Sequence, residues 1–287
     1  MIDRIIVWLF DHRGRLFLLL CLPLLAVAWQ RAADRWRAAM AVGPEYGAYR
    51  IAPRHDDDTL RVAVIGDSWA EYHTTLECDT IFRRMAGRLT DRPVKCFSNG
   101  HSGKATKAIY NDMFADRTVE HAWQRNYCTQ PLMEQHPDYC VIMAGINDLR
   151  LYKPPGFYTG NYRLIINLLL KLGIRPVVME MPDVDFKGAV ENRPFVDRAA
   201  FRVLSWITGV DYRSAADYRA AMRNMLSEGH LTDSVLFIPV DSWNPGGAFS
   251  RPEIYLDDRF HLNLDGYHVI DSCMAAEIIK DFEKMRY

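Results

Sequence analysis

The sequence predicts an α/β protein in which helices cover both faces of a five-stranded parallel sheet. Two observations support this fold class: short apolar segments alternate with longer segments of helical periodicity, and polar clusters follow several of the apolar segments. Strands of a parallel sheet are apolar throughout when helices cover both of its faces. The intervening segments are long enough for the right-handed crossovers that parallel strands require.

Strands and helices alternate along the chain from residue 60 onwards. The predicted strands are 60–65 (LRVAVI), 94–97, 139–144 (YCVIMA), 176–181 (PVVMEM) and 235–240 (VLFIPV). The predicted helices, in which apolar residues recur at helical spacing, are 74–89, 162–172, 212–229 and 264–285. Gly173 follows one of them as a stop signal. Three segments, near 110–135, 183–211 and 241–256, interrupt the alternation and are interpreted as inserts.

Composition excludes several classes of function. The chain has 287 residues, of which 49% are hydrophobic, enough for one large domain or two small ones. The 35 basic and 36 acidic residues nearly balance, so nucleic acid is not an expected partner. The six cysteines show no C-x-x-C spacing, and no cofactor is expected. We favour buried free thiols over a disulfide such as Cys128 with Cys140.

Residues 1–29 are interpreted as a signal anchor or a cleaved signal peptide, built on an N-terminal hydrophobic helix. Residues 16–29 carry no charge, and the AVA motif at 26–28 resembles a signal-peptidase site. Either interpretation places the rest of the chain outside the cytoplasm, in or beyond the cell envelope. Arginines on both sides of the segment leave its orientation open. The alternative, a buried core helix, is disfavoured because the run has no polar face.

The remaining chain divides by composition into two parts. Residues 30–58 contain Pro44, Pro53 and a run of three aspartates, which predicts a stalk or linker. Residues 59–287 are expected to form the folded domain.

Polar clusters at 66–68, 145–148 and 258–261 are expected to meet at one edge of the sheet. The carboxyl ends of parallel strands share an edge, and ligands of such sheets bind there. The clusters supply a serine hydroxyl, an asparagine amide and a histidine with a nearby carboxylate. These groups are the ones that acyl transfer through a serine requires.

Ser68 is the candidate nucleophile of this site, although a helix N-cap is an alternative role for a serine at a strand-to-helix junction. Asp258 and His261 are three residues apart, so a helical turn would place both side chains on one side. The carboxylate would then hold one imidazole nitrogen, and the other would accept the serine proton. Asp265 and His268 repeat the spacing within the start of the last helix. Binding of a divalent metal by the two pairs is a disfavoured alternative, because no third histidine or cysteine supports it.

Amide donors for a developing oxyanion are found in two further clusters. Gly103 lies in a glycine-containing stretch at 99–106, where the backbone can approach a ligand closely. Asn147 offers a side-chain amide after the third strand. With the main-chain amide of Ser68, these two residues are expected to form an oxyanion hole.

The four clusters together resemble the SGNH, or GDSL-type, hydrolase superfamily, which is named for a serine, a glycine, an asparagine and a histidine in separate blocks. The resemblance covers residues 61–268 and implies a three-layer αβα, flavodoxin-like fold with esterase or acyltransferase activity. It also implies roles for individual residues. These are Ser68, Asp258 and His261 as the catalytic triad, and Ser68, Gly103 and Asn147 as the oxyanion hole.

Two residues depart from the usual pattern of this superfamily. Trp69 follows the serine, where leucine is common, and His101 stands where a small or aliphatic residue is usual. We expect Trp69, His101 and Asp148 to contact the substrate. Asp148 is equally suited to capping the turn in which it lies.

The function predicted from these observations is a serine esterase that removes a short acyl group from an envelope or extracellular carbohydrate. Aromatic residues in the inserts, Trp123, Tyr127, Trp206 and Trp243, suit sugar rings, although they also suit ordinary packing. Two alternatives remain open. One is a membrane-tethered acyltransferase or lysophospholipase, and the other is a catalytically silent glycan-binding protein of the same fold.

Overall fold

The computed structural model describes residues 13–45, 57–75, 78–89, 91–114, 129–184, 194–211, 214–246 and 250–286. These residues divide into two compact units, one that ends at Ala41 and one that begins at Val42.

The first unit contains helix α2, Arg13–Met40, with Pro23 in its interior. Several large apolar side chains of this helix are exposed, among them Leu24, Leu25 and Trp29. Within the described residues, no helix combines the length and the apolar character that crossing a membrane requires.

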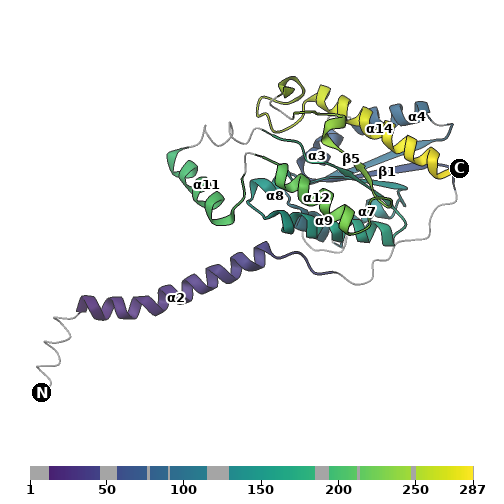
Figure 1. The fold of residues 1–287 in the computed structure, drawn as a ribbon. Coiled ribbons are helices and arrows are strands. Elements are labelled where there is room, and N and C mark those ends of the chain that lie inside the picture. The colour runs from purple at the N-terminus through teal and green to yellow at the C-terminus, as the bar shows by residue number, and fades with distance from the viewer. Residues whose placement is uncertain are drawn as a thin grey trace, which may run out of the picture. The chain divides into compact units, whose positions relative to one another are not determined.

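The second unit is built on a five-stranded sheet in which every neighbouring pair is parallel, in the order β2-β1-β3-β4-β5 (Figure 1). The strands are β1 (Leu60–Gly66), β2 (Val94–Gly100), β3 (Tyr139–Met143), β4 (Arg175–Met179) and β5 (Leu236–Ile238). β1 and β3 are buried along their whole length, as their uniformly apolar sequences predict. The predicted five-stranded parallel sheet is therefore confirmed.

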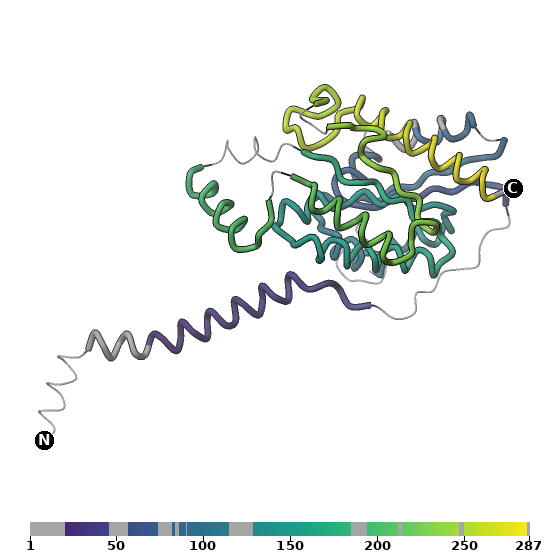
Figure 2. Tube along the Cα trace, in the orientation of Figure 1, coloured from purple at the N-terminus to yellow at the C-terminus, as the bar shows by residue number. Residues whose placement is uncertain are grey.

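Helices form a layer on each face of this sheet, which gives the three-layer αβα arrangement. α4 (Cys78–Leu89) and α14 (Leu264–Arg286) cover one face, and Figure 2 shows α14, in yellow, beside α4 although the two are far apart in sequence. The other face carries α5 (Thr106–Met113), α9 (Pro155–Lys171) and α12 (Ala216–Glu228).

Shorter elements occupy the connections, together with one longer helix inside an expected insert. They are α3 (Ser68–Thr75), α7 (Gln130–Met133), α8 (Ile146–Arg150), α11 (Phe195–Thr208), η1 (Val240–Ser242) and η2 (Pro252–Ile254). The helix predicted at 74–89 is thus two helices, α3 and α4. α11 was not predicted, because most of its apolar residues do not pack into the core.

Close packing of α3 against the end of β2 depends on Gly100. A Cβ atom at this position would lie 1.9 Å from the main-chain nitrogen of Glu71 in α3. Because real Cβ atoms do not approach so closely, a larger residue would push α3 away from the sheet. This contact fixes the height of α3 above the carboxyl edge.

Part of the predicted linker, from Val42 onwards, belongs to the second unit. The main-chain nitrogen of Gly43 donates a hydrogen bond of 2.9 Å to Oδ1 of Asn161 in α9, and Lys171 forms an ion pair with Glu45. The segment 30–58 is therefore not uniform, since its first part belongs to α2.

Cys140 carries a free thiol in β3, and burial raises its pKa. The free thiol of Cys140 contradicts the alternative of a disulfide with Cys128. Cys128 itself lies outside the described residues.

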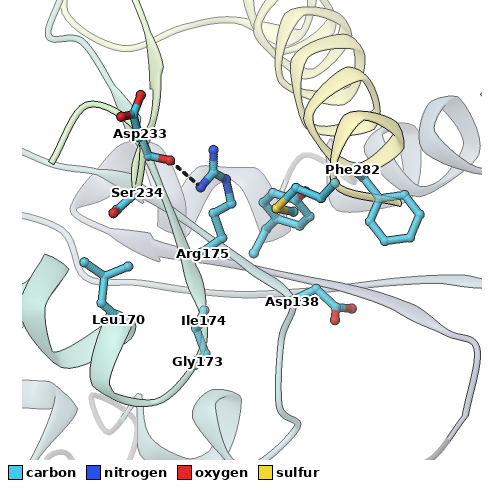
Figure 3. Close-up of a pocket in the computed structure, with 10 residues that line it drawn as sticks. Asp138, Leu170, Gly173, Ile174, Arg175, Asp233, Ser234 and Phe282 are labelled. Atoms are coloured by element: carbon cyan, nitrogen blue, oxygen red, sulfur yellow. Dashed lines mark hydrogen bonds between the residues drawn. The ribbon is translucent and has the colours of Figure 1, made fainter. Parts of the chain in front are cut away.

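A cavity of about 500 Å³ lies at the amino ends of β3 and β4, where it is lined by Tyr139 and Arg175 (Figure 3). Arg175 donates a hydrogen bond to the main-chain oxygen of Asp233 and pairs with Asp281. This edge of the sheet is opposite to the one where the three polar clusters were expected to meet.

Candidate active site

Ser68 is the first residue of α3 and lies two residues after the last residue of β1, Gly66. Its neighbour Asp67 shapes this corner, because its main-chain nitrogen donates to the oxygen of Met143 and its Oδ1 atom accepts a hydrogen bond of 3.1 Å from the nitrogen of Trp69. Asp67 thereby caps the helix. The N-terminus of a helix favours negative charge, which is the charge that develops when a serine attacks an ester.

His261 lies beside this serine although the two residues are 193 positions apart. Its Nε2 atom is 3.0 Å from Oγ of Ser68, and its Nδ1 atom is 2.6 Å from Oδ2 of Asp258. The three side chains therefore form a continuous chain of hydrogen bonds from carboxylate to hydroxyl.

The turn that carries Asp258 and His261 is not helical, contrary to our expectation. Tyr255 and Leu262 form an isolated antiparallel bridge that closes the turn, and Arg259 adopts a positive φ of 51°. Oδ1 of Asp258 accepts hydrogen bonds of 2.9 Å from the main-chain nitrogens of Phe260 and His261. The side chains face each other because the carboxylate organises this turn.

The environment of Asp258 favours its ionised form. Partial burial by itself would raise the pKa of Asp258. Hydrogen bonds from the main chain and imidazole of His261, with a further one from the nitrogen of Phe260, outweigh that effect and lower the pKa below its ordinary value of 3.8. An ionised carboxylate is the form that holds the imidazole in one tautomer and stabilises its positive charge.

Asn147 reaches the same edge through a tight turn after β3. Gly145 has a φ of +122°, and a Cβ atom there would lie 2.6 Å from the ring of Tyr158. Only glycine fits this turn. The Asn147 side chain is buried, and it lies close enough to Asp67 to lower the pKa of that carboxyl group. Its Nδ2 atom nevertheless makes no hydrogen bond of standard geometry to the described residues. A buried donor without a partner is a candidate for binding a ligand.

Gly103 lies in the loop after β2, with a positive φ of 76° and open space on the side where a Cβ atom would lie. Glu71 in α3 supports this loop, since its Oε2 atom accepts a hydrogen bond of 2.9 Å from the nitrogen of Ser102. Glu71 was not predicted as a residue of the site. Its position one helical turn after Ser68 is the only sequence signal that we find for it.

His101 and Asp148, which we expect to contact the substrate, have their polar groups engaged within the protein. Both are buried and bonded within the protein. Nδ1 and Nε2 of His101 face Asp112 and Asn99, at 2.9 and 3.0 Å.

The two carboxylate oxygens of Asp148 accept hydrogen bonds from the nitrogen and hydroxyl of Thr106, at 2.9 and 2.7 Å. Asp148 therefore ties α8, which carries Asn147, to the start of α5, three residues after Gly103.

Trp69 is 4% exposed, and its indole packs inside the protein. It donates a hydrogen bond of 3.3 Å to the oxygen of Phe260 and meets the ring of Trp243 edge-on at 6.0 Å. With Asp67, these two indoles line a cavity of about 20 Å³, room for roughly one water molecule.

Trp243 is also buried, which favours ordinary packing over contact with a sugar ring. Trp206 is exposed on α11, whereas Trp123 and Tyr127 lie outside the described residues.

Further residues near the site were not predicted. The ring of Tyr72 lies 4.9 Å from that of His261, and the hydroxyl of Tyr267 donates to the oxygen of Trp69 at 2.9 Å.

Asp265 and His268, the pair that repeats the spacing of Asp258 and His261, are exposed on α14. Within the described residues, no group of three or more metal-ligating side chains is positioned to hold an ion.

A serine, a histidine and an aspartate in this order of contact, at the carboxyl edge of a parallel sheet, define the serine-hydrolase class of site. The sequence pattern of the GDSL-like lipase/acylhydrolase family matches residues 64–269, more than half of the chain. The chain belongs to this family of ester-hydrolysing enzymes.

Solved structures share the fold at low sequence identity. The lipase/acylhydrolase from Enterococcus faecalis is 14% identical, with a TM-score of 0.54, and the match covers 77% of this chain and 96% of that one. The psychrotrophic esterase EstA from Pseudoalteromonas sp. is 13% identical, with a TM-score of 0.50, and the match covers 79% and 100%. Among curated protein sequences, no significant relative was found.

Asp67 and Asp148 are both fully buried in the site, and burial is the main reason that the pKa of each is raised to about 7. Repulsion by Asp148 adds to the effect at Asp67, whereas hydrogen bonds partly offset it at both residues. These two carboxyl groups therefore bind more protons in the folded chain than in the unfolded chain between about pH 4 and pH 7. Their contribution to stability falls as the pH rises through this range.

We predict that Asp67→Asn removes part of this loss. The free energy of unfolding of the variant, relative to the wild type, should increase from about pH 4 to about pH 7, by on the order of a few kcal/mol, and then level off. Urea unfolding followed by circular dichroism at several pH values measures this difference. A difference that stays constant with pH would show that burial does not hold Asp67 neutral.

Proposed function

We propose that this protein is a serine esterase that removes a short acyl group, such as acetyl, from a carbohydrate of the cell envelope or extracellular space. The observation that carries the proposal is the chain of hydrogen bonds from Asp258 through His261 to Ser68, at 2.6 and 3.0 Å. The 3.0 Å distance suits proton transfer from Ser68 to His261 without rearrangement, while Asp258 holds the imidazole in place.

In the proposed reaction, Oγ of Ser68 attacks the ester carbonyl while Nε2 of His261 accepts the hydroxyl proton. His261 then donates this proton to the departing sugar oxygen, and the acyl group stays on Ser68 as an ester. A water molecule, deprotonated by His261, attacks that ester and releases the carboxylic acid and free serine. Asp258 stays ionised and holds the imidazole throughout.

The carbonyl oxygen becomes negative in both attacks. We propose that the main-chain nitrogens of Ser68 and Gly103 and the Nδ2 atom of Asn147 donate hydrogen bonds to it. The buried Nδ2 atom without a standard hydrogen bond supports this role for Asn147. Held donors of this kind stabilise the transition state without reorganising during the reaction.

One feature beside the site supports a polar scaffold. The turn next to His261 exposes Asp257 and Arg259, which suit hydroxyl groups better than hydrocarbon.

We predict that Ser68→Ala abolishes hydrolysis of an acetylated oligosaccharide and labelling by a fluorophosphonate probe, because both reactions need the serine oxygen. The loss in kcat should be on the order of 10⁶-fold, as for removal of a nucleophile from a serine triad. Acetate release and in-gel fluorescence are the measurements. Exposed Ser242, whose hydroxyl donates to the main-chain oxygen of Pro239, provides the matched Ser→Ala control.

The same assay separates the alternatives. Release of fatty acid from a lysolipid, with no release of acetate from the sugar, would show that the enzyme is a lysophospholipase and contradict the proposed substrate. Transfer from an acyl-CoA to an alcohol would indicate an acyltransferase. A folded wild type that neither reacts with the probe nor releases acid would contradict the proposed chemistry.

We predict that Asn147→Ala lowers kcat by about 10²–10³-fold, equal to roughly 2.7–4 kcal/mol, with little change in KM. The donor is needed mainly when the oxygen becomes charged, so substrate binding should suffer less. Steady-state kinetics on the acetylated substrate measure the split, with Asn111→Ala on the exposed side of α5 as control. A rise in KM of about 10²–10³-fold with unchanged kcat would instead assign Asn147 to substrate binding.

We also propose that residues 1–29 attach the enzyme to a membrane of the envelope, with residues 59–287 outside the cytoplasm. The exposed leucines of α2 support this proposal. The full chain should stay with membranes after an alkaline carbonate wash, and Leu24→Asp with Leu25→Asp should release it. N-terminal sequencing of an exported, shorter chain would instead establish a cleaved signal peptide, and an intact chain in the cytoplasm would exclude both.

A further inference from the structure

Helix α11 exposes a continuous apolar face to solvent. Phe195 is 74% and Trp206 is 83% exposed, and Val196, Val203 and Ile207 are each more than half exposed. Residues 195, 199, 203 and 206 follow one another at steps of three and four, as do 196, 200, 203 and 207, so they share one side of the helix. Within the described chain, no segment covers this side.

The opposite side of α11 attaches it to the rest of the domain. The ring of Phe201 lies 5.8 Å from that of Tyr152, which is two residues after α8, and the hydroxyl of Ser205 donates to the oxygen of Val210 at 2.7 Å. Val210 is itself buried. The helix is therefore fastened by one side and presents the apolar side outward.

The chemistry of the exposed side favours a lipid surface over a protein partner. A tryptophan and a phenylalanine lie among aliphatic residues. Exposed Arg202 lies at the border of the apolar face, partly buried Arg198 lies between that border and the attached side, and the helix has a single acidic residue, Asp197. This composition is typical of helices that lie in the headgroup region of anionic membranes.

A second, independent helix of the chain points to the same partner. α2 also exposes large apolar side chains, including Leu24 at 71% and Trp29 at 76%. Two separate exposed apolar helices are unusual for a chain that meets only water. We propose that α11 is an interfacial helix that binds a membrane containing anionic lipid, independently of the N-terminal segment.

This binding would bring the lipid surface to the reactive side of the enzyme. The chain enters the α11 region from the carboxyl end of β4, the same edge of the sheet that holds Ser68, and Figure 1 shows α11 at the end of the domain where α8 lies. The substrate scaffold would then be one that is itself held at the membrane.

The test compares the full-length wild type with Trp206→Ser combined with Ile207→Ser. A matched control removes exposed apolar residues elsewhere, Leu89→Ser with Met285→Ser, which are 54% and 56% exposed in the wild type. Hydrogen exchange of the 195–208 peptide is followed with and without vesicles of phosphatidylcholine and phosphatidylglycerol. This peptide reports on α11 even where the N-terminal segment holds the chain on the vesicle.

Vesicles should slow exchange at 195–208 by roughly tenfold in the wild type and the control, and the α11 variant should lose this protection. Vesicles of phosphatidylcholine alone should protect less, because the two arginines then lack anionic partners. Absence of protection in the wild type, or its persistence in the variant, would overturn the proposal. The proposal would also be overturned if the lipid-free wild type sedimented as a dimer and the α11 variant as a monomer, since a second copy would then cover the helix.

Hydrolysis of a water-soluble acetyl ester should be equal in all three proteins, because neither pair of substitutions lies in the reacting site. This measurement separates the two proposals. Lost protection with intact hydrolysis concerns the membrane contact, whereas absent hydrolysis with intact protection concerns the esterase.

Discussion

The hydrogen bond between Ser68 and His261 sets the requirement that the surrounding structure must meet, because it joins two segments from opposite ends of the domain. The sheet brings them to one edge, but further contacts fix their separation. Trp69, next to the serine, donates to the oxygen of Phe260, next to the histidine, and the hydroxyl of Tyr267 in α14 donates to the oxygen of Trp69. A displacement of about 1 Å between reacting groups can cost roughly 10²-fold in rate. These neighbours therefore matter to the reaction although none of them reacts.

The donors on the other side of the serine are held by three acidic groups, of which Asp67 and Asp148 are buried. Asp148 joins α8 to the start of α5, Glu71 holds the loop of Gly103, and Asp67 caps α3 while lying near Asn147. Burial disfavours the charged forms of Asp67 and Asp148, as their raised pKa values show. Such groups reduce stability at neutral pH but fix the orientation of the loops that they bind. A site that works by preoriented dipoles gains rate from this rigidity.

The sequence was sufficient to predict the sheet and the proximity of the reacting groups, because uniformly apolar strands and the shared carboxyl edge of parallel strands follow from simple rules. It was not sufficient for local geometry. The spacing of Asp258 and His261 suggested a helical turn, whereas the positive φ of Arg259 and the amide bonds to Asp258 make a closed loop. The partners of His101 and Asp148 could not be predicted, because burial and distant partners, such as Thr106 at 42 positions away, are not visible in a motif. α11 was missed although its apolar residues recur at helical spacing, because the segment was interpreted as an insert.

The polar turn at 257–259 and the apolar face of α11 favour different chemistry, since one suits hydroxyl groups and the other suits lipid. They concern different parts of a substrate, however. The polar turn lies next to His261 and suits the immediate scaffold of the acyl group, while α11 determines the surface on which the enzyme works. Attachment to a surface confines enzyme and substrate to a thin layer and raises their effective concentration without any new contact at the reacting atoms. An acylated carbohydrate held at a membrane satisfies both features, and a freely diffusing one leaves the exposed face of α11 without a physical reason.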